Sequence, residues 1–234
     1  MELTPDQYFA APAACYVRGM LGADAEPARA HPGLFGPSPA TLSSDDLLAL
    51  IRIGQDAGLR LHRFKRTMGL ARVARGLGIL HGLGPESLLD IGSGRGAFLW
   101  PLLDAFPALP ITVAERDAAR VAGITAVRAG GWPRLTAMQA DATALPFEDG
   151  AFDVATMLEV LEHIPDARRA LGEAVRVARR SVVLSVPSHR DNNPEHIHLF
   201  DRRALLALFA AAGASNARFE YVHNHLIAVA RVAR

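Results

Sequence analysis

From Pro85 onward, short apolar runs alternate with stretches of helical periodicity, and this alternation constrains the fold more than any other feature. The apolar runs have the length of strands, and the alternation is typical of a parallel sheet covered by helices. The strands predicted in this way cover residues 87–91, 111–115, 135–140, 152–157, 181–186, 217–222 and 226–232. We therefore expect an α/β fold with a Rossmann-like, doubly wound, seven-stranded sheet whose last strand is antiparallel.

Helices are predicted between the strands and throughout the N-terminal part of the chain. Residues 97–105, 167–178 and 202–212 have helical periodicity, and Asp201 is suited to cap the last of these helices. Near the N-terminus, Thr4 before Pro5 indicates the start of a first helix. Ser43 or Ser44 can cap a second helix that ends near Gly58, and a third helix is predicted over residues 59–80. We expect residues 1–84 to form a helical extension or lid and residues 85–234 to form a separate domain.

Composition excludes several classes of protein. The formal net charge is +1, which argues against a nucleic-acid-binding surface that covers the whole protein. No apolar run approaches the roughly 18–20 residues that span a bilayer, and Met1 is not followed by the basic and apolar segments of a secretory signal. Cys15 is the one cysteine, so an internal disulfide is excluded. These features favour a cytoplasmic protein that does not enter a membrane.

A glycine-rich turn follows the first predicted strand. Gly92, Gly94 and Ala97 fit the spacing G-x-G-x-x-G/A, in which glycines let the backbone approach a nucleotide-type ligand closely. Asp90 stands two residues before Gly92, where its carboxylate would repel a pyrophosphate and attract a cation. S-adenosylmethionine carries a sulfonium and an ammonium group and no phosphate. The charge at this turn therefore favours it over a nicotinamide dinucleotide.

Four segments in this part of the chain have the order and spacing of a known set of motifs. They are residues 89–96, 111–115, 139–147, and 152–154 followed by 158–163. Together they resemble the motifs of the class I S-adenosylmethionine-dependent methyltransferases that act on small molecules, and the resemblance covers about residues 85–234. It implies that the cofactor is bound by Asp90, Gly92, Ser93, Gly94, Glu115, Arg116, Asp141, Ala142 and Met157.

The resemblance assigns roles to two of these acids, and each role has a simpler alternative. Glu115 stands where the family binds the ribose hydroxyls, and a carboxylate there can accept two hydrogen bonds. Asp141 stands where the family meets the adenine amino group. The alternative is that Glu115 is a solvated charge at a strand end and Asp141 a turn residue.

Candidates for contact with the methyl acceptor lie in the loops after the fourth and fifth strands, because ligands bind outside the carboxyl ends of such strands. The catalytic candidates are His163 in the first loop and His196 and His198 in the second. A histidine in either loop could accept a proton from an acceptor hydroxyl. Two alternatives stay open for the second loop: His196 and His198 could bind a metal with Asp191 or Glu195, or they could be structural. We expect no metal.

A basic segment precedes the first strand. It carries Arg60, Arg63, Lys65, Arg66, Arg72 and Arg75, and no acidic residue lies between Asp56 and Glu86. If its helix covers the acceptor site, it favours an anionic acceptor. The alternative is a solvated helix face.

These patterns predict an enzyme that transfers the methyl group of S-adenosylmethionine to a small-molecule acceptor, at oxygen. Two other hypotheses remain: a nicotinamide-dependent oxidoreductase on the same fold, and a protein that binds S-adenosylmethionine without catalysis. The sequence does not reveal the identity of the acceptor.

Overall fold

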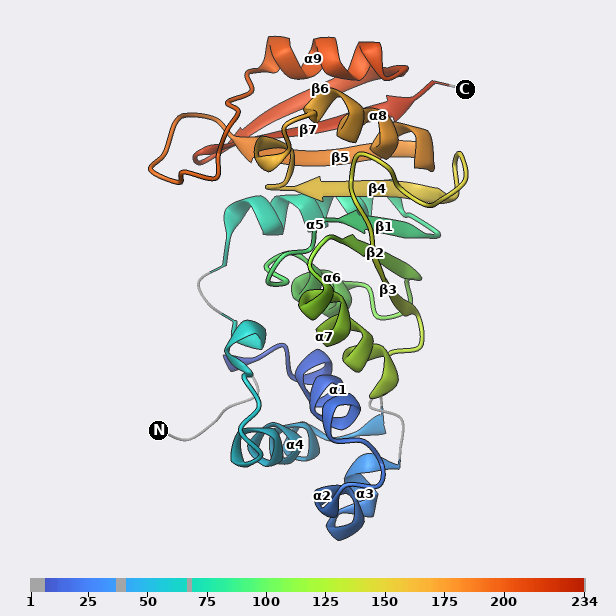
Figure 1. Cartoon of the computed structure of the whole chain (residues 1–234), viewed down its shortest axis with the longest axis vertical. Helices are drawn as coiled ribbons and strands as arrows, with labels where there is room; N and C mark the ends of the chain where they lie inside the picture. Colours follow the sequence, from blue (N-terminus) through green and yellow to red (C-terminus); the bar gives the residue numbers. More distant parts are fainter. Residues whose placement is uncertain (1–6, 37–40, 67–68, 234) are drawn as a thin grey trace. The chain divides into compact units, whose positions relative to one another are not determined.

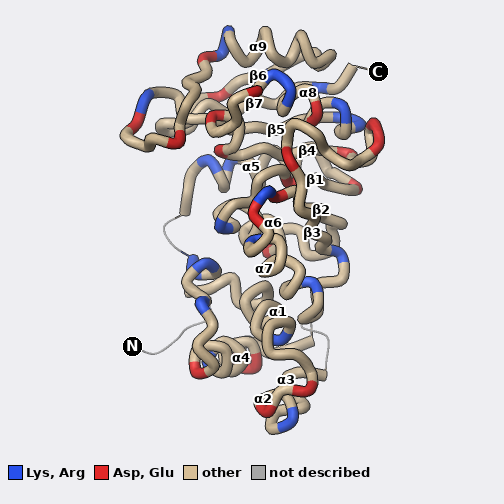
Figure 2. Tube along the Cα trace, viewed as in Figure 1, with Lys and Arg blue, Asp and Glu red and all other residues tan. Residues whose placement is uncertain are grey.

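The computed structural model describes residues 7–36, 41–66 and 69–233 (Figure 1). The chain divides into two compact units. The first comprises Met1–Gly69, Gly94–Ala108 and Asp117–Ala137, and the second Leu70–Ser93, Leu109–Arg116 and Met138–Arg234. Acidic and basic residues are interspersed along the trace of each unit (Figure 2). The division at residue 84 into an extension and a domain stays a prediction.

The first unit contains most of the N-terminal helices together with α6 and α7. Its helices are α1 (Ala10–Leu21), α2 (Glu26–Ala30), α3 (Pro32–Phe35), α4 (Ser44–Asp56), η3 (His62–Phe64), α6 (Leu99–Ala105) and α7 (Ala118–Ala129). Helix α1 packs closely on α7, because a β-carbon on Gly19 would lie only 1.9 Å from the carbonyl oxygen of Ala126. Cys15 of α1 is buried, and burial raises the pKa of its thiol to about 12. This thiol is therefore a packing group at neutral pH.

The N-terminal helix predictions have mixed outcomes. Of the two predicted caps, Ser43 caps α4 through a capping box with Asp46, and Gly58 follows the helix with a φ of 77°. The start predicted at Thr4 lies outside the described residues. The single helix predicted over residues 59–80 is wrong.

Residues 59–80 contain instead the short η3 and the start of α5 (Ala71–Leu83). The amide of Phe9 donates to the carbonyl of Phe64, and the amide of Arg66 donates to that of Gln7. These bonds to a distant segment replace the helical hydrogen bonds, so the helix cannot continue through Lys65, whose backbone is extended.

The sheet predicted from the sequence is confirmed. In the described part of the chain it has seven strands, in the order β3-β2-β1-β4-β5-β7-β6. The strands are β1 (Leu88–Ile91), β2 (Ile111–Glu115), β3 (Leu135–Gln139), β4 (Phe152–Leu158), β5 (Ala178–Pro187), β6 (Ala214–Val222) and β7 (His225–Val232). β1 pairs in parallel with β2 and β4, β4 pairs in parallel with β5, and β7 is antiparallel to both β5 and β6.

The helices of the second unit pack against the sheet. Besides α5, they are η4 (Leu161–His163), α8 (Ala167–Val177) and α9 (Arg202–Ala211). The Asp201 side chain accepts a hydrogen bond from the amide of Ala204, so the predicted cap of α9 is confirmed. Helices α8 and α9 pack on the same apolar core as β4, β5 and β7. None of the described helices combines the length and apolar character needed to cross a bilayer.

This topology determines where a ligand can bind. From β1 the chain goes on to β2 on one side, and β4 lies on the other side, so the order reverses at β1. In open α/β sheets, ligands bind at such a switch point, outside the carboxyl ends of the strands. The turn after β1 and the loops after β2, β4 and β5 all begin at this edge.

Candidate active site

The glycine turn after β1 is held against two neighbouring strands. The amide of Gly92 donates to the carbonyl of Ala114 on β2, 2.8 Å away. Gly92 has a φ of 73°, and a β-carbon there would lie 2.7 Å from Cγ2 of Val160, which follows β4. Gly94 also has a positive φ, of 57°. Only glycine fits position 92 without strain, because its α-carbon packs against the Val160 side chain at the switch point.

The Asp90 side chain is buried and hydrogen-bonded to other residues of the protein. It is 2% exposed, its Oδ1 accepts from the Thr156 hydroxyl of β4 at 2.8 Å, and its Oδ2 accepts from the Ser93 hydroxyl. Burial raises the pKa of Asp90, the charge of Glu115 acts in the same direction, and the two hydroxyls oppose them. The carboxylate thus connects β4 to the turn and orders Ser93 within it.

Glu115 ends β2 beside this turn. It is 4% exposed, and its carbonyl accepts a hydrogen bond from the amide of Ala140, 3.1 Å away. The following residue, Arg116, is exposed, and its carbonyl accepts from the side-chain amide of Gln139 at 3.1 Å. These two bonds hold the end of β3 beside the end of β2.

Asp141 and Ala142 lie in the turn after β3. Oδ1 of Asp141 accepts from the amide and from the hydroxyl of Thr143, both at 2.8 Å. These hydrogen bonds hold the pKa of Asp141 below its usual value. Ala142 is partly buried. By contrast, Met157 is completely buried in the core within β4, so only its backbone is placed to meet a ligand.

An ion-pair cluster that the sequence reasoning missed lies just after β4. Glu159 has a φ of 56°, and its Oε1 accepts from the Ser185 hydroxyl of β5 at 2.6 Å. Its Oε2 lies 3.0 Å from Nε2 of His225 and 3.9 Å from Nε of Arg72. Burial lowers the pKa of His225, partly offset by Glu159. The antiparallel pairing of His225 with Pro187 places this histidine at the carboxyl edge. The two strands predicted over residues 217–222 and 226–232 leave His225 in the turn between them, which was the sequence signal for this position.

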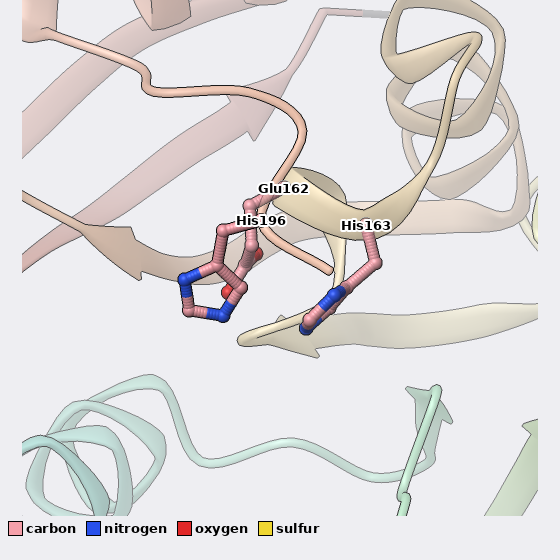
Figure 3. A group of neighbouring side chains, drawn as sticks. All are labelled: Glu162, His163 and His196. Atoms are coloured by element: carbon pink, nitrogen blue, oxygen red, sulfur yellow. The ribbon is translucent and has the colours of Figure 1, made fainter. Parts of the chain in front are cut away.

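A second cluster brings together Glu162, His163 and His196 (Figure 3). One ligand atom from each side chain lies within 4.8 Å of the others. The two imidazole rings meet edge to face, with centroids 4.8 Å apart. Burial, helped by the charge of Glu159, raises the pKa of Glu162 to about 8. The sequence analysis named the two histidines as candidates but gave no role to Glu162.

His198 does not join this cluster through its Nε2. That atom lies 3.1 Å from the carbonyl oxygen of Ile164 and 3.2 Å from that of Pro165. A carbonyl only accepts, so Nε2 of His198 carries a proton and anchors the loop after β5 to the loop after β4. His196 and His198, on either side of Ile197, both line a cavity of about 110 Å³ in the loop after β5.

A larger hollow lies at the opposite edge of the sheet. It has a volume of about 450 Å³ and is lined by Asn216, Ala217, Arg218 and Arg231. Arg231 pairs with Ser181 near the start of β5, which is the edge away from the carboxyl ends. This hollow therefore has no place in the candidate site.

The basic segment does not form one helix face. In the first unit, Arg66 pairs with Asp104 at 2.6 Å, and the Arg63 guanidinium lies over the ring of Tyr16. In the second unit, Arg72 faces Glu159. Arg75, also in the second unit, pairs with Glu220 at 2.7 Å.

Comparison with known proteins agrees with this geometry. Residues 89–186 match the family model described as a methyltransferase domain. This part of the chain is a class I S-adenosylmethionine-dependent methyltransferase domain. The matched residues run from β1 to β5, so the methyltransferase domain contains the glycine turn, Glu115, Asp141 and the cluster after β4.

Among curated relatives, the chain is 32% identical over 106 residues to a demethylmenaquinone methyltransferase of Thermus thermophilus. It is 35% identical over 96 residues to a 27-O-demethylrifamycin SV methyltransferase of Amycolatopsis mediterranei. These matches cover 44% and 40% of this chain, and 48% and 35% of the relatives' own lengths. The chain therefore matches less than half of the length of each of these relatives.

The fold has solved counterparts. The N-terminal domain of EvdMO1, solved with SAH bound, aligns with a TM-score of 0.57 at 18% identity, covering 70% of this chain and 82% of that one. At this identity the likeness shows the fold alone.

Proposed function

We propose that this chain binds S-adenosylmethionine at the carboxyl ends of β1, β2 and β3 and transfers its methyl group to a small-molecule acceptor. One observation carries the proposal. The buried Glu115 lies beside the Gly92 turn, because the Gly92 amide donates to the carbonyl of Ala114, the residue before Glu115, at the point where the strand order reverses.

The proposed cofactor contacts follow from these positions. Glu115 accepts hydrogen bonds from the ribose hydroxyls, and Arg116 covers the adjoining surface. Oδ1 of Asp141 is engaged by Thr143, which leaves Oδ2 to accept from the adenine amino group, next to the backbone of Ala142.

The methionine part of the cofactor would lie along the turn. The backbone of Gly92, Ser93 and Gly94 approaches it, and Met157 contributes through its backbone. Asp90 orders the turn through Ser93 and adds negative charge beside a ligand whose sulfonium and ammonium are positive. A pyrophosphate would meet the same carboxylates unfavourably, which argues against a nicotinamide dinucleotide.

Methyl transfer itself is an in-line displacement. The acceptor atom attacks the methyl carbon, the carbon–sulfur bond breaks, and its electron pair goes to sulfur. For this step the acceptor must be held about 3 Å from the methyl group, opposite the sulfur. The loops after β4 and β5 begin at the correct edge for this and carry His163 and His196.

We propose oxygen as the acceptor atom, with these histidines acting on its hydroxyl. Nδ1 of His163 lies 3.0 Å from the carbonyl oxygen of Glu195 and therefore carries a proton, so Nε2 presents a lone pair. The name of the Amycolatopsis relative indicates an O-methylation, which is consistent with an oxygen acceptor. The observation that favours an anionic acceptor is the position of Arg72. Its guanidinium group already lies close to the Glu159 carboxylate, which offsets part of its positive charge.

Titration calorimetry tests cofactor binding. S-adenosylmethionine and SAH, its demethylated product, should bind the wild-type protein, and NADH should not compete with them. Glu115→Gln should weaken binding by about 1–3 kcal/mol, the loss of hydrogen bonds to a charged acceptor. Glu148→Gln is the matched control, since Glu148 is exposed in the loop before β4. If NADH binds more tightly than S-adenosylmethionine, the cofactor assignment is wrong. It is also wrong if Glu115→Gln, like Glu148→Gln, binds S-adenosylmethionine as tightly as the wild type does.

A further inference from the structure

Three potential metal ligands converge at the carboxyl edge, from two separate loops. Glu162 and His163 belong to η4, directly after β4, and His196 belongs to the loop after β5. Their ligand atoms lie within 4.8 Å of one another, and the three side chains extend to the same side of their backbones (Figure 3). Such separations allow a single ion about 2.0–2.2 Å from each atom after a small inward adjustment.

The Glu162 carboxylate is buried without a partner. The residue is 0% exposed, and among the described residues neither Oε1 nor Oε2 has a hydrogen-bond partner. A buried polar group without a partner is costly, and buried carboxylates are ordinarily paired with a cation or bound to a metal. The nearest carboxylate neighbour, Glu159, has Ser185, His225 and Arg72 as its own partners. The Glu162 carboxylate is therefore available as a ligand for a cation.

Each imidazole has an oxygen atom beside its Nδ1, as metal-binding histidines ordinarily do. Nδ1 of His163 lies 3.0 Å from the Glu195 carbonyl oxygen. Nδ1 of His196 lies 2.9 Å from Oδ2 of Asp191, although the angles there are not those of a hydrogen bond. A carbonyl or carboxylate behind Nδ1 favours the tautomer whose Nε2 is unprotonated and able to bind a metal.

The backbone fixes the two loops relative to each other. The amides of Ile197 and His198 both donate to the carbonyl of Glu162, at 3.0 and 3.2 Å. The His198 side chain adds its contacts to the carbonyls of Ile164 and Pro165. These bonds hold His196 against η4, so the site is built before any ion arrives.

We infer that Glu162, His163 and His196 bind one divalent transition-metal cation. Two imidazoles and one carboxylate suit Zn²⁺, Mn²⁺, Fe²⁺ or Co²⁺, whereas Ca²⁺ and Mg²⁺ prefer oxygen ligands throughout. This inference departs from the expectation of no metal. It also differs from the alternative based on His196 and His198, because His198 is bound to the two carbonyls instead.

The location gives the cation a role that rests on the proposed function. Three protein ligands leave coordination positions open, and the site stands at the edge where the acceptor is expected. An acceptor hydroxyl bound there would lose its proton to water more readily, because the cation stabilises the oxyanion. The histidines would then act on the hydroxyl through the cation.

Metal binding can be tested without the cofactor or the acceptor. Tag-free protein, treated with chelator and dialysed, is titrated with ZnCl₂ and MnCl₂ in a calorimeter, and the visible spectrum is recorded with CoCl₂. The wild type should bind one equivalent and should give a ligand-field spectrum with Co²⁺. Glu162→Gln, His163→Gln and His196→Ala should each weaken binding at least tenfold. His31→Ala, at an exposed histidine of the first unit, is the control and should leave binding unchanged.

Two outcomes would overturn the inference. One is a wild-type protein that binds none of the three cations at the millimolar level. The other is binding that all three variants retain while the melting curves show them folded. Calorimetry with SAH on the same samples separates this test from the proposed function, since loss of SAH binding would count against the cofactor site and leave the metal result unaffected.

Discussion

The Thr156 hydroxyl on β4 donates a hydrogen bond to Oδ1 of Asp90 on β1, at 2.8 Å, in the interior of the sheet. Asp90 in turn accepts from Ser93, so β4 is connected to the glycine turn through one buried carboxylate. The side chain that the sequence analysis treated as a charge beside a ligand is also part of the framework that shapes the turn.

Thr156→Val should therefore destabilise the protein although the two side chains have nearly the same shape. The variant leaves a buried carboxylate with one partner fewer, at a cost of about 1–3 kcal/mol. Thr112→Val, on the neighbouring β2, is the control and should change the free energy of unfolding little. Urea unfolding of the three proteins decides the matter, and equal stability of both variants would show that the Asp90–Thr156 bond contributes nothing.

Gly92→Ala should distort the turn. The added carbon would lie 2.7 Å from Val160 at a φ of 73°, and such overpacking costs about 1–3 kcal/mol. Val160→Ala in the same chain should restore part of the loss, because it removes the contacting methyl groups. Gly172→Ala in α8 has nothing within 4 Å and should stabilise the protein by about 0.5–1 kcal/mol. A Gly92→Ala protein with wild-type stability and SAH affinity would contradict the close packing of this turn.

The strands and the doubly wound sheet could be predicted because the apolar runs of a buried parallel sheet are visible in the sequence. The helix at residues 59–80 could not be placed, since its ending depends on backbone bonds to Gln7 and Phe9, far away in the chain. The same holds for the site. His163 and His196 could be named as candidates because both follow strands that end at the carboxyl edge. The contact between His196 and Glu162 could not be predicted, because it depends on hydrogen bonds from the amides of Ile197 and His198 to the Glu162 carbonyl.

The charge network of Asp153 should make stability depend on pH. Its buried carboxylate accepts from the amide of Glu86 and from the guanidinium groups of Arg179 and Arg180. Burial alone would raise the pKa of Asp153, but these donors outweigh it and hold the pKa below its usual value. The network therefore stabilises the folded state above the unfolded pKa of about 3.9 and is lost as the pH falls below it.

Asp153→Asn should cost about 1–3 kcal/mol at pH 7 and should flatten the fall in stability below about pH 5. Asp149→Asn removes an exposed partner of Arg176 and should cost less than about 1 kcal/mol. Urea unfolding between pH 3 and pH 7 measures both effects. A variant at Asp153 whose stability falls with acid as steeply as that of the wild type would contradict the assignment.

His198→Ala and His196→Ala should affect different properties. Because His198 anchors the carbonyls of Ile164 and Pro165, its loss should lower the free energy of unfolding by about 1–3 kcal/mol. His196→Ala should lower turnover at least about tenfold, in line with typical contributions of groups that act on a transferred proton, while SAH affinity stays unchanged. Melting curves, calorimetry and turnover on each variant separate the two roles. A stable His198→Ala protein, or full turnover by His196→Ala, would contradict this division.

The central claim is that the chain moves a methyl group from S-adenosylmethionine to a small molecule. The direct measurement is transfer of label from S-adenosylmethionine with a radioactive methyl group into the low-molecular-weight fraction of an extract from the source cell, with Glu115→Gln as the matched control. The account predicts a labelled small molecule and an equal amount of SAH with the wild type, and a strongly reduced yield with the variant. Bound cofactor without labelled product would support the non-catalytic alternative. Oxidation of NADH by the same extract and protein, without label transfer, would contradict the account.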